Sequence, residues 1–253
     1  MLDLLDYSPS HLYNVRMSIQ NRIAIITGAG RGIGRATAQR FAREGARVVL
    51  FSRTPSSLNE VDAEIARKGG HALAIVGDVS SEEDVRALFE RIMAIYGRVD
   101  ILVNCAGIVA VRPFVEMDVS TWDTVIGVNL RGTFLCCLAA FRIMANQRKG
   151  VIINISSLSG VKGVEKFAGL SAYNVSKSGV AGLTEMLAIE GKPYNIRVCA
   201  LSPGAVDTEM LRQAAPHLKA GMTSDDMAEI LLFLADDSGR MLSGTNIEIF
   251  SNI

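Results

Sequence analysis

The sequence predicts a single α/β domain, with a Rossmann-like, doubly wound parallel sheet of about seven strands and helices on both faces. Three observations predict this fold. Short β-branched runs alternate with longer segments of helical period over nearly the whole chain. Several runs are apolar at successive positions, which is typical of strands covered on both faces. No linker, repeat or low-complexity segment divides the 253 residues.

The expected strands share this continuous apolar character, and they are Arg22–Thr27, Arg47–Phe51, Ala72–Val76, Asp100–Asn104, Val151–Ile155, Ile196–Leu201 and Asn246–Phe250. The segments between them can each form a crossover helix, and they include Gly34–Glu44, Ser57–Lys68, Glu82–Tyr96, Thr121–Ala145 and Ala172–Glu190. Residues 1–20 show neither the two-residue period of a strand nor the 3.6-residue period of a helix. We expect them to form a loosely attached extension, or a short surface helix, ahead of a dinucleotide-binding and catalytic domain over residues 21–253.

Composition excludes several classes of function. The 26 basic and 26 acidic residues cancel, so no excess charge favours nucleic acid or an anionic membrane. No apolar run reaches the ~18 residues that a membrane helix needs. The four cysteines form no CxxC pair and the three histidines form no ligand cluster, so we expect reduced thiols and no metal site. These features favour a cytoplasmic protein.

A glycine-rich loop follows the first expected strand, with the sequence Thr27-Gly28-Ala29-Gly30-Arg31-Gly32-Ile33-Gly34. Glycine lets the chain turn sharply and lets its backbone approach a ligand closely. The free N–H groups of the helix that follows favour a pyrophosphate. The spacing differs from GxGxxG, and no Gly-Lys-Ser/Thr of a P-loop is present. A glycine turn without a ligand is the alternative.

The end of the second strand indicates which dinucleotide binds. An NAD site often has an acidic residue there for the ribose 2′-hydroxyl, whereas this chain has Ser52 and Arg53. Arg53 and Arg31 could both bind a 2′-phosphate through paired donors. We therefore expect NADP(H), with NAD(H) as the less favoured cofactor. Two solvated surface arginines would be the alternative.

Tyr173 and Lys177 are spaced i, i+4 in a helical segment, so both side chains lie on one face. A nearby ammonium would lower the pKa of the tyrosine and prepare it to exchange a proton with a carbonyl oxygen. Ser157 follows the fifth strand, where its hydroxyl could stabilise an oxyanion. Helix capping is the alternative for this serine.

Over about residues 20–250, these separated motifs resemble the short-chain dehydrogenase/reductase family, and 3-oxoacyl-[acyl-carrier-protein] reductases in particular. The resemblance implies that Tyr173 is the acid/base, that Ser157 orients the substrate carbonyl and that Lys177 holds the nicotinamide ribose. It implies that Asn129 supports a proton-relay water. The residues expected to bind the cofactor are Gly28, Arg31, Gly32, Ile33, Gly34, Ser52, Arg53, Asp78, Val79, Asn104, Ala106, Gly107, Tyr173, Lys177, Pro203, Gly204, Val206 and Thr208.

Three departures from the family pattern bear on the pocket. Cys105 replaces the second Asn of Asn-Asn-Ala-Gly. The segment from Gly204 to Thr223 is short, so the pocket could be open or completed by a partner subunit. Val161–Lys166 looks like an insertion that reshapes the pocket mouth, and the chain stops soon after Phe250.

We therefore expect an NADP(H)-dependent oxidoreductase that interconverts a ketone or 3-oxoacyl carbonyl and a secondary alcohol by hydride transfer. Alternatives are an NAD-dependent alcohol or sugar dehydrogenase of the same family and a non-catalytic dinucleotide sensor or scaffold. We expect a small carbonyl or alcohol compound as the substrate, or an acyl-carrier thioester. Arg148, Lys149 and Lys192 could form a basic patch for an acidic carrier protein, and ordinary surface charges are the favoured alternative. The resemblance implies a homotetramer formed through the segments Thr121–Ala145 and Ala172–Glu190.

Overall fold

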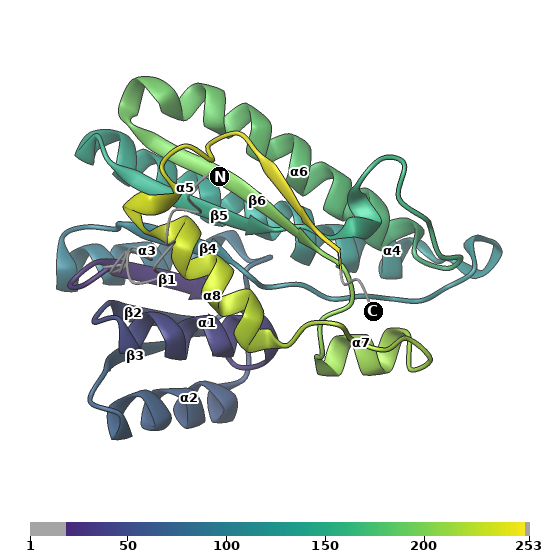
Figure 1. The fold of residues 1–253 in the computed structure, drawn as a ribbon, viewed down its shortest axis with the longest axis horizontal. Coiled ribbons are helices and arrows are strands. Elements are labelled where there is room, and N and C mark those ends of the chain that lie inside the picture. Colours follow the sequence, from purple (N-terminus) through teal and green to yellow (C-terminus); the bar gives the residue numbers. More distant parts are fainter. Residues whose placement is uncertain (1–18, 251–253) are drawn as a thin grey trace, which may run out of the picture.

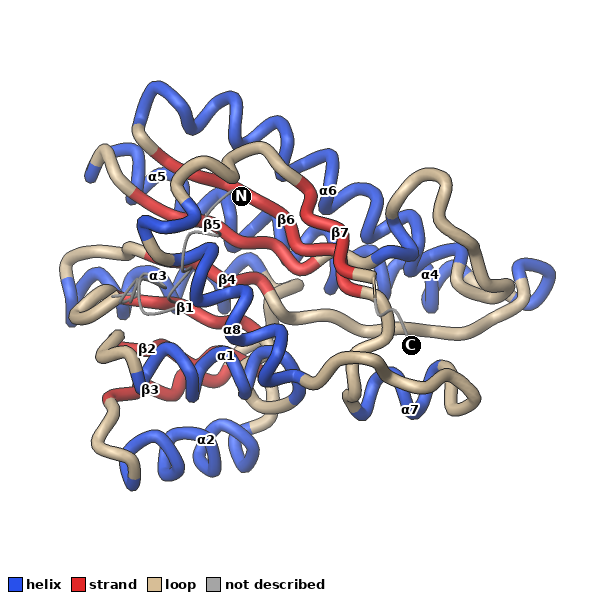
Figure 2. Tube along the Cα trace, in the orientation of Figure 1, coloured by secondary structure: helices blue, strands red, loops and turns tan. Residues whose placement is uncertain are grey.

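A computed structural model of the chain describes residues 19–250. All seven strands are parallel and follow the order β3-β2-β1-β4-β5-β6-β7, as the red segments of Figure 2 show. The strands are β1 Ile23–Thr27, β2 Arg47–Ser52, β3 His71–Val76, β4 Ile101–Asn104, β5 Gly150–Ile155, β6 Ile196–Pro203 and β7 Asn246–Ile249. The predicted doubly wound sheet is confirmed, and each observed strand agrees with its expected range to within two residues.

Eight α-helices occur in the described residues, and Figure 1 labels them. They are α1 Gly32–Arg43, α2 Pro55–Arg67, α3 Glu82–Tyr96, α4 Val119–Ile126, α5 Gly132–Gln147, α6 Ser171–Gly191, α7 Glu209–Ala214 and α8 Ser224–Ala235. Local signals explain where several begin and end. The Ser81 side chain caps the first turn of α3, and Gly97 ends that helix in the left-handed conformation. Thr223 and Asp226 form a reciprocal capping box on α8.

The sheet is covered on both faces, which explains why its strands are apolar at successive positions. On one face, Phe41 of α1, Leu58 of α2 and Leu231 of α8 belong to one buried cluster. On the other face, Leu88 of α3 and Leu135 of α5 belong to a second cluster. Alternate residues along β1 to β6 supply the two clusters, because successive side chains point to opposite faces.

The segment expected as one helix over Thr121–Ala145 is interrupted. A π-helical turn, Gly127–Arg131, joins α4 to α5. The continuous helical stretch Val119–Gln147 is long and apolar enough to cross a membrane by length and composition alone. Half of its most apolar window is buried, and α5 packs against β4, β5 and β6. We therefore interpret the stretch Val119–Gln147 as a core helical segment of this domain.

The proposed extension over residues 1–20 lies almost wholly outside the described residues. Ile19 is fully buried and belongs to the cluster under α1 and α8. Gln20 lies against Gly45, close to the start of β2. These two residues therefore pack with the domain.

Candidate active site

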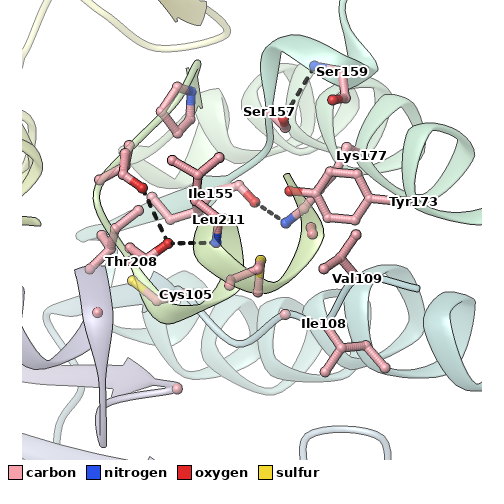
Figure 3. A pocket seen from close by; sticks show the side chains of 18 of the residues that line it. Cys105, Ile108, Val109, Ile155, Ser157, Ser159, Tyr173, Lys177, Thr208 and Leu211 are labelled. Atoms are coloured by element: carbon pink, nitrogen blue, oxygen red, sulfur yellow. Dashed lines mark hydrogen bonds between the residues drawn. The ribbon is translucent and has the colours of Figure 1, made fainter. Parts of the chain in front are cut away.

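A cleft of about 1140 Å³ lies at the carboxyl edge of the sheet. Its lining comes from residues that follow all seven strands, together with α6, α7 and the π-helical turn. β1 lies between β2 and β4 in the sheet, so the order of the strands reverses direction at β1. Doubly wound sheets bind their ligands at the carboxyl ends of the strands next to such a reversal. Figure 3 shows part of this cleft, with Tyr173, Lys177 and Ser157 close together.

The glycine loop is shaped by close approaches that only glycine allows. Gly28 and Gly32 have φ angles of +64° and +52°. A Cβ on Gly28 would lie 2.8 Å from the Cα of Ala106, and one on Gly34 would collide with the carbonyl oxygen of Gly28. No side chain caps the N-terminus of α1, so its first N–H groups remain available to an anion. This loop therefore fits a dinucleotide pyrophosphate.

The loop after β4 is fixed by two side chains from distant parts of the sequence. The Thr27 hydroxyl accepts a hydrogen bond from the Ala106 N–H, at 3.1 Å. Asn129 accepts from the Ile108 N–H at 2.8 Å and donates to the Ile108 carbonyl at 2.9 Å. It also donates to the Ser176 hydroxyl at 3.0 Å. The π-helical turn thus connects this loop to α6, which carries Tyr173 and Lys177.

Three groups converge where β5 meets α6. Tyr173 lies one turn before Lys177, and the Lys177 Nζ is 5.7 Å from the centre of the Tyr173 ring. The Lys177 ammonium donates to the Ile155 carbonyl at 2.8 Å. The Ser157 hydroxyl accepts from the Ser159 N–H at 3.1 Å, so this serine also caps a short 3₁₀ turn, as the alternative interpretation held.

The pKa of Tyr173 differs from the expectation. Burial raises it because a phenolate would lose its water, and the Ser157 hydroxyl lowers it only in part. The expected net lowering of this pKa is therefore contradicted, because the effect of burial is the largest, and the Lys177 ammonium donates its hydrogen bond to the Ile155 carbonyl. Burial also lowers the pKa of Lys177, from 10.5 to about 8.

The far end of the cleft carries the residues considered for the cofactor ribose. The Ser52 hydroxyl is buried there and has no hydrogen-bond partner in the described chain. The Arg53 guanidinium lies 3.6 Å from Asp78, and Arg31 lies 2.8 Å from Glu209. Burial would raise the pKa of Asp78, but hydrogen bonds from Ser80 and the charge of Arg53 outweigh it and lower this pKa. The unpartnered hydroxyl and the nearby arginines fit a polar ribose group.

Two predicted site residues do not line the cleft. Asn104 is buried behind it, where its amide donates to Asn154 at 2.8 Å. Asn154 in turn donates to the Thr184 hydroxyl at 2.9 Å, so these two hydrogen bonds join β4, β5 and α6. Asn129 is also fully buried and binds Ile108 and Ser176 rather than facing the cleft. The other predicted cofactor and catalytic residues all line the cleft.

Sequence reasoning missed α7, which forms inside the short segment after Gly204. Met210, Leu211 and Ala214 of α7 line the cleft, so this chain's own helix borders the pocket that we expected to be open or completed by a partner. The six residues show too short a pattern to reveal a helical period. The Thr208 cap, whose hydroxyl accepts from the Leu211 N–H, was the available signal.

The basic patch lies at the opposite edge of the sheet. Arg148 and Lys149 immediately precede β5, and Lys192 begins the turn before β6. Arg148 donates to the Pro193 carbonyl at 2.9 Å, which brings these segments together. The cleft is at the carboxyl ends of the same strands. The patch is therefore poorly placed to guide a carrier protein to the cleft.

Comparison with known proteins identifies the family. The model of the short chain dehydrogenase family matches residues 22–219. The chain belongs to the short-chain dehydrogenase/reductase family. It is thus placed among oxidoreductases that act on CH–OH or C=O groups and bind a nicotinamide dinucleotide.

Short-chain dehydrogenases similar to this one come from several bacteria. An uncharacterised oxidoreductase, YxjF of Bacillus subtilis, is 40% identical over 89% of this chain and 87% of its own. The 3-oxoacyl-[acyl-carrier-protein] reductase FabG of Thermotoga maritima is 34% identical over 92% and 98%. A crystal structure from Beutenbergia cavernae, of a proposed NAD(P)-dependent gluconate 5-dehydrogenase with bound NADP, has a TM-score of 0.86 and 34% identity over 93% and 97%.

Proposed function

We propose that this protein is an NADP(H)-dependent carbonyl reductase that interconverts a ketone and a secondary alcohol, with Tyr173 as its acid/base. One observation carries the proposal: Tyr173, Ser157 and Lys177 meet at one end of a cleft whose other end is the uncapped start of α1. A nicotinamide bound in this cleft would supply or accept the hydride.

Each catalytic side chain has a role in this proposal. Tyr173 donates its phenolic proton to the carbonyl oxygen in reduction and takes it back in oxidation. Ser157 donates a hydrogen bond to the same oxygen and stabilises the charge that develops on it. Lys177 is a buried ammonium with a pKa of about 8, which places a positive charge beside the phenol and the ribose. Asn129 holds the loop and α6 in position through Ile108 and Ser176.

The preference for NADP(H) is supported by Arg53, which follows β2, and by Arg31 of the glycine loop, both of which line the cleft. It is also supported by Ser52, because β2 ends there without an acidic side chain. The related structure with bound NADP supports it as well. An NAD-dependent alcohol or sugar dehydrogenase is the second candidate. It is favoured by the carboxylates of Glu209 and Asp78, which already partner the two arginines.

The related FabG proteins support a 3-oxoacyl thioester as one substrate to test. A homotetramer is supported by apolar side chains exposed on the helices expected at its interfaces, namely Phe134 of α5 and Met186 and Ile189 of α6. A cytoplasmic location is supported by the four cysteines, all of which are free thiols.

The experiment is a panel of ketones, 3-oxoacyl thioesters and sugars with NADPH and with NADH, followed at the nicotinamide absorbance. We expect turnover of a ketone with a lower KM for NADPH, and a loss of about a hundred-fold or more in Tyr173→Phe. A KM for NADH no higher than that for NADPH would favour the second candidate. Nucleotide binding with no turnover of any compound would favour a non-catalytic sensor.

A further inference from the structure

The part of the cleft beyond Tyr173 is mainly apolar. Val164 and Phe167 border it from the loop before α6, and Met210, Leu211 and Leu218 border it from α7 and the segment that follows. We call these five residues the apolar wall. Figure 3 shows Leu211 on one side of this end of the cleft and Val109 near Tyr173.

The charges in this part of the cleft are unfavourable to an anion. Among the described residues that line it, the charged or titratable side chains are Glu165, Glu209 and His217, together with Arg31, whose guanidinium pairs with Glu209 at 2.8 Å. No lysine or arginine in the two wall segments lines the cleft. An anion placed there would lose its water and would find the Arg31 guanidinium already paired with Glu209, while the Glu165 carboxylate would repel it.

Two basic side chains of these segments, Lys166 and Arg212, make other contacts. Lys166 donates to the Ser159 carbonyl at 2.7 Å and to the Val161 carbonyl. Arg212 pairs with Asp207. The expected insertion Val161–Lys166 is thus fastened by its own last residue to the 3₁₀ turn after Ser157. This contact keeps Val164 and Phe167 beside the catalytic serine.

We propose that the substrate is an uncharged carbonyl compound with an apolar body that packs on the apolar wall, and that the site discriminates against carboxylate substrates such as keto acids and sugar acids. This inference rests on the proposed function and narrows its substrate class. Packing on the wall removes apolar surface of substrate and protein from water, which supplies the binding energy.

The test compares substrates that differ in charge alone. Methyl levulinate and levulinate are assayed as reductase substrates with NADPH. A second methyl ester and its free acid, both with a longer apolar chain, are assayed in the same way. We expect kcat/KM for each ester to exceed that for its acid by at least about ten-fold, because the acid carries an unpaired charge into the cleft. Equal or faster turnover of the acids would overturn the inference and leave the reductase activity intact. No turnover of any carbonyl compound would instead overturn the proposed function.

Two further measurements test the wall itself. Phe167→Ala should raise the KM of the longer ester about five-fold, through lost apolar contact, and leave the KM for NADPH unchanged. Phe233→Ala on α8 is the matched control, because Phe233 is similarly exposed (40% against 45%) and does not line the cleft. In Tyr173→Phe, calorimetry should give a lower Kd for the ester than for the acid. An unchanged KM of the longer ester in Phe167→Ala, or tighter binding of the acid than of the ester to Tyr173→Phe, would contradict the proposed role of the apolar wall.

Discussion

The hydroxyl of Ser156 donates a hydrogen bond to the backbone carbonyl of Lys177, at 2.8 Å, inside the buried junction of β5 and α6. The Lys177 ammonium returns a hydrogen bond to the Ile155 carbonyl, also at 2.8 Å. The lysine is therefore fixed to the end of β5 at both its backbone and its side chain. Ser156 is 2% exposed and its hydroxyl is bonded to the Lys177 carbonyl, so we regard it as a positioning residue.

Ser156→Ala should lower kcat/KM about ten-fold, because Lys177 loses one of its two attachments and a buried carbonyl loses its donor. The variant should also let water reach the ammonium and raise the pKa of Lys177 from about 8 towards 10.5. The measurement is the pH profile of kcat/KM. Ser156→Thr keeps the hydroxyl and should restore the profile. A uniform loss of activity at every pH would indicate a general structural defect instead.

Lys177 should destabilise the fold at neutral pH. Its folded pKa of about 8 lies below the usual 10.5, so the charged form is less favourable in the folded state. This destabilising contribution is fully present below pH 8, decreases as pH rises towards 10.5, and is absent above it. Lys177→Met should therefore be inactive but about 2 kcal/mol more stable at pH 7. Denaturant unfolding of both proteins from pH 7 to 10.5 measures this, and a difference independent of pH would contradict it.

Gly34→Ala should impair nucleotide binding, because the new Cβ would collide with the carbonyl oxygen of Gly28 and distort the loop. We expect the KM for NADPH to rise at least about ten-fold. Gly182→Ala is the control within α6, since its Cβ would meet nothing within 4 Å. The control should keep nucleotide binding and gain about 1 kcal/mol of stability from helix propensity. Equal nucleotide affinity in both variants would contradict the assigned role of the loop.

Glu209→Gln should improve the use of NADPH. Glu209 occupies Arg31 through an ion pair in which both side chains are more than half exposed, so the pair itself is worth about 0–1 kcal/mol. Releasing Arg31 should lower the KM for NADPH by a factor of about two to five. The KM for NADH should not change, because NADH has no 2′-phosphate. A parallel fall in both values would show that Glu209 acts on the cleft as a whole.

Much of the fold could be predicted because its strands are apolar on both faces and its loops carry glycine. The carboxyl ends of parallel strands share one edge of the sheet. The sequence therefore predicted that Ser157, Tyr173 and Lys177 lie close together. The direction of a buried side chain was beyond such reasoning. Asn104 and Asn129 occur in the family motifs, but packing turns both towards other protein groups.

The electrostatics could not be predicted either, since they depend on burial and on partners distant in sequence. The raised pKa of Tyr173 follows from desolvation, and the pairing of Arg31 with Glu209 spans 178 positions. The position of Arg148 at the opposite edge could have been predicted from topology but was not, because a residue that precedes a parallel strand lies at its amino end.

The separation of the apolar wall from the acid/base group has a practical consequence for redesign. The wall is carried by loop residues and α7, whereas the Ser157 hydroxyl follows β5 and the Tyr173 hydroxyl and Lys177 ammonium are carried by α6. Libraries confined to Val164, Phe167 and Leu218 could therefore explore new specificities without disturbing the sheet. Directed evolution of this enzyme should begin there, and a lysine introduced among these positions would be the first route to acidic substrates.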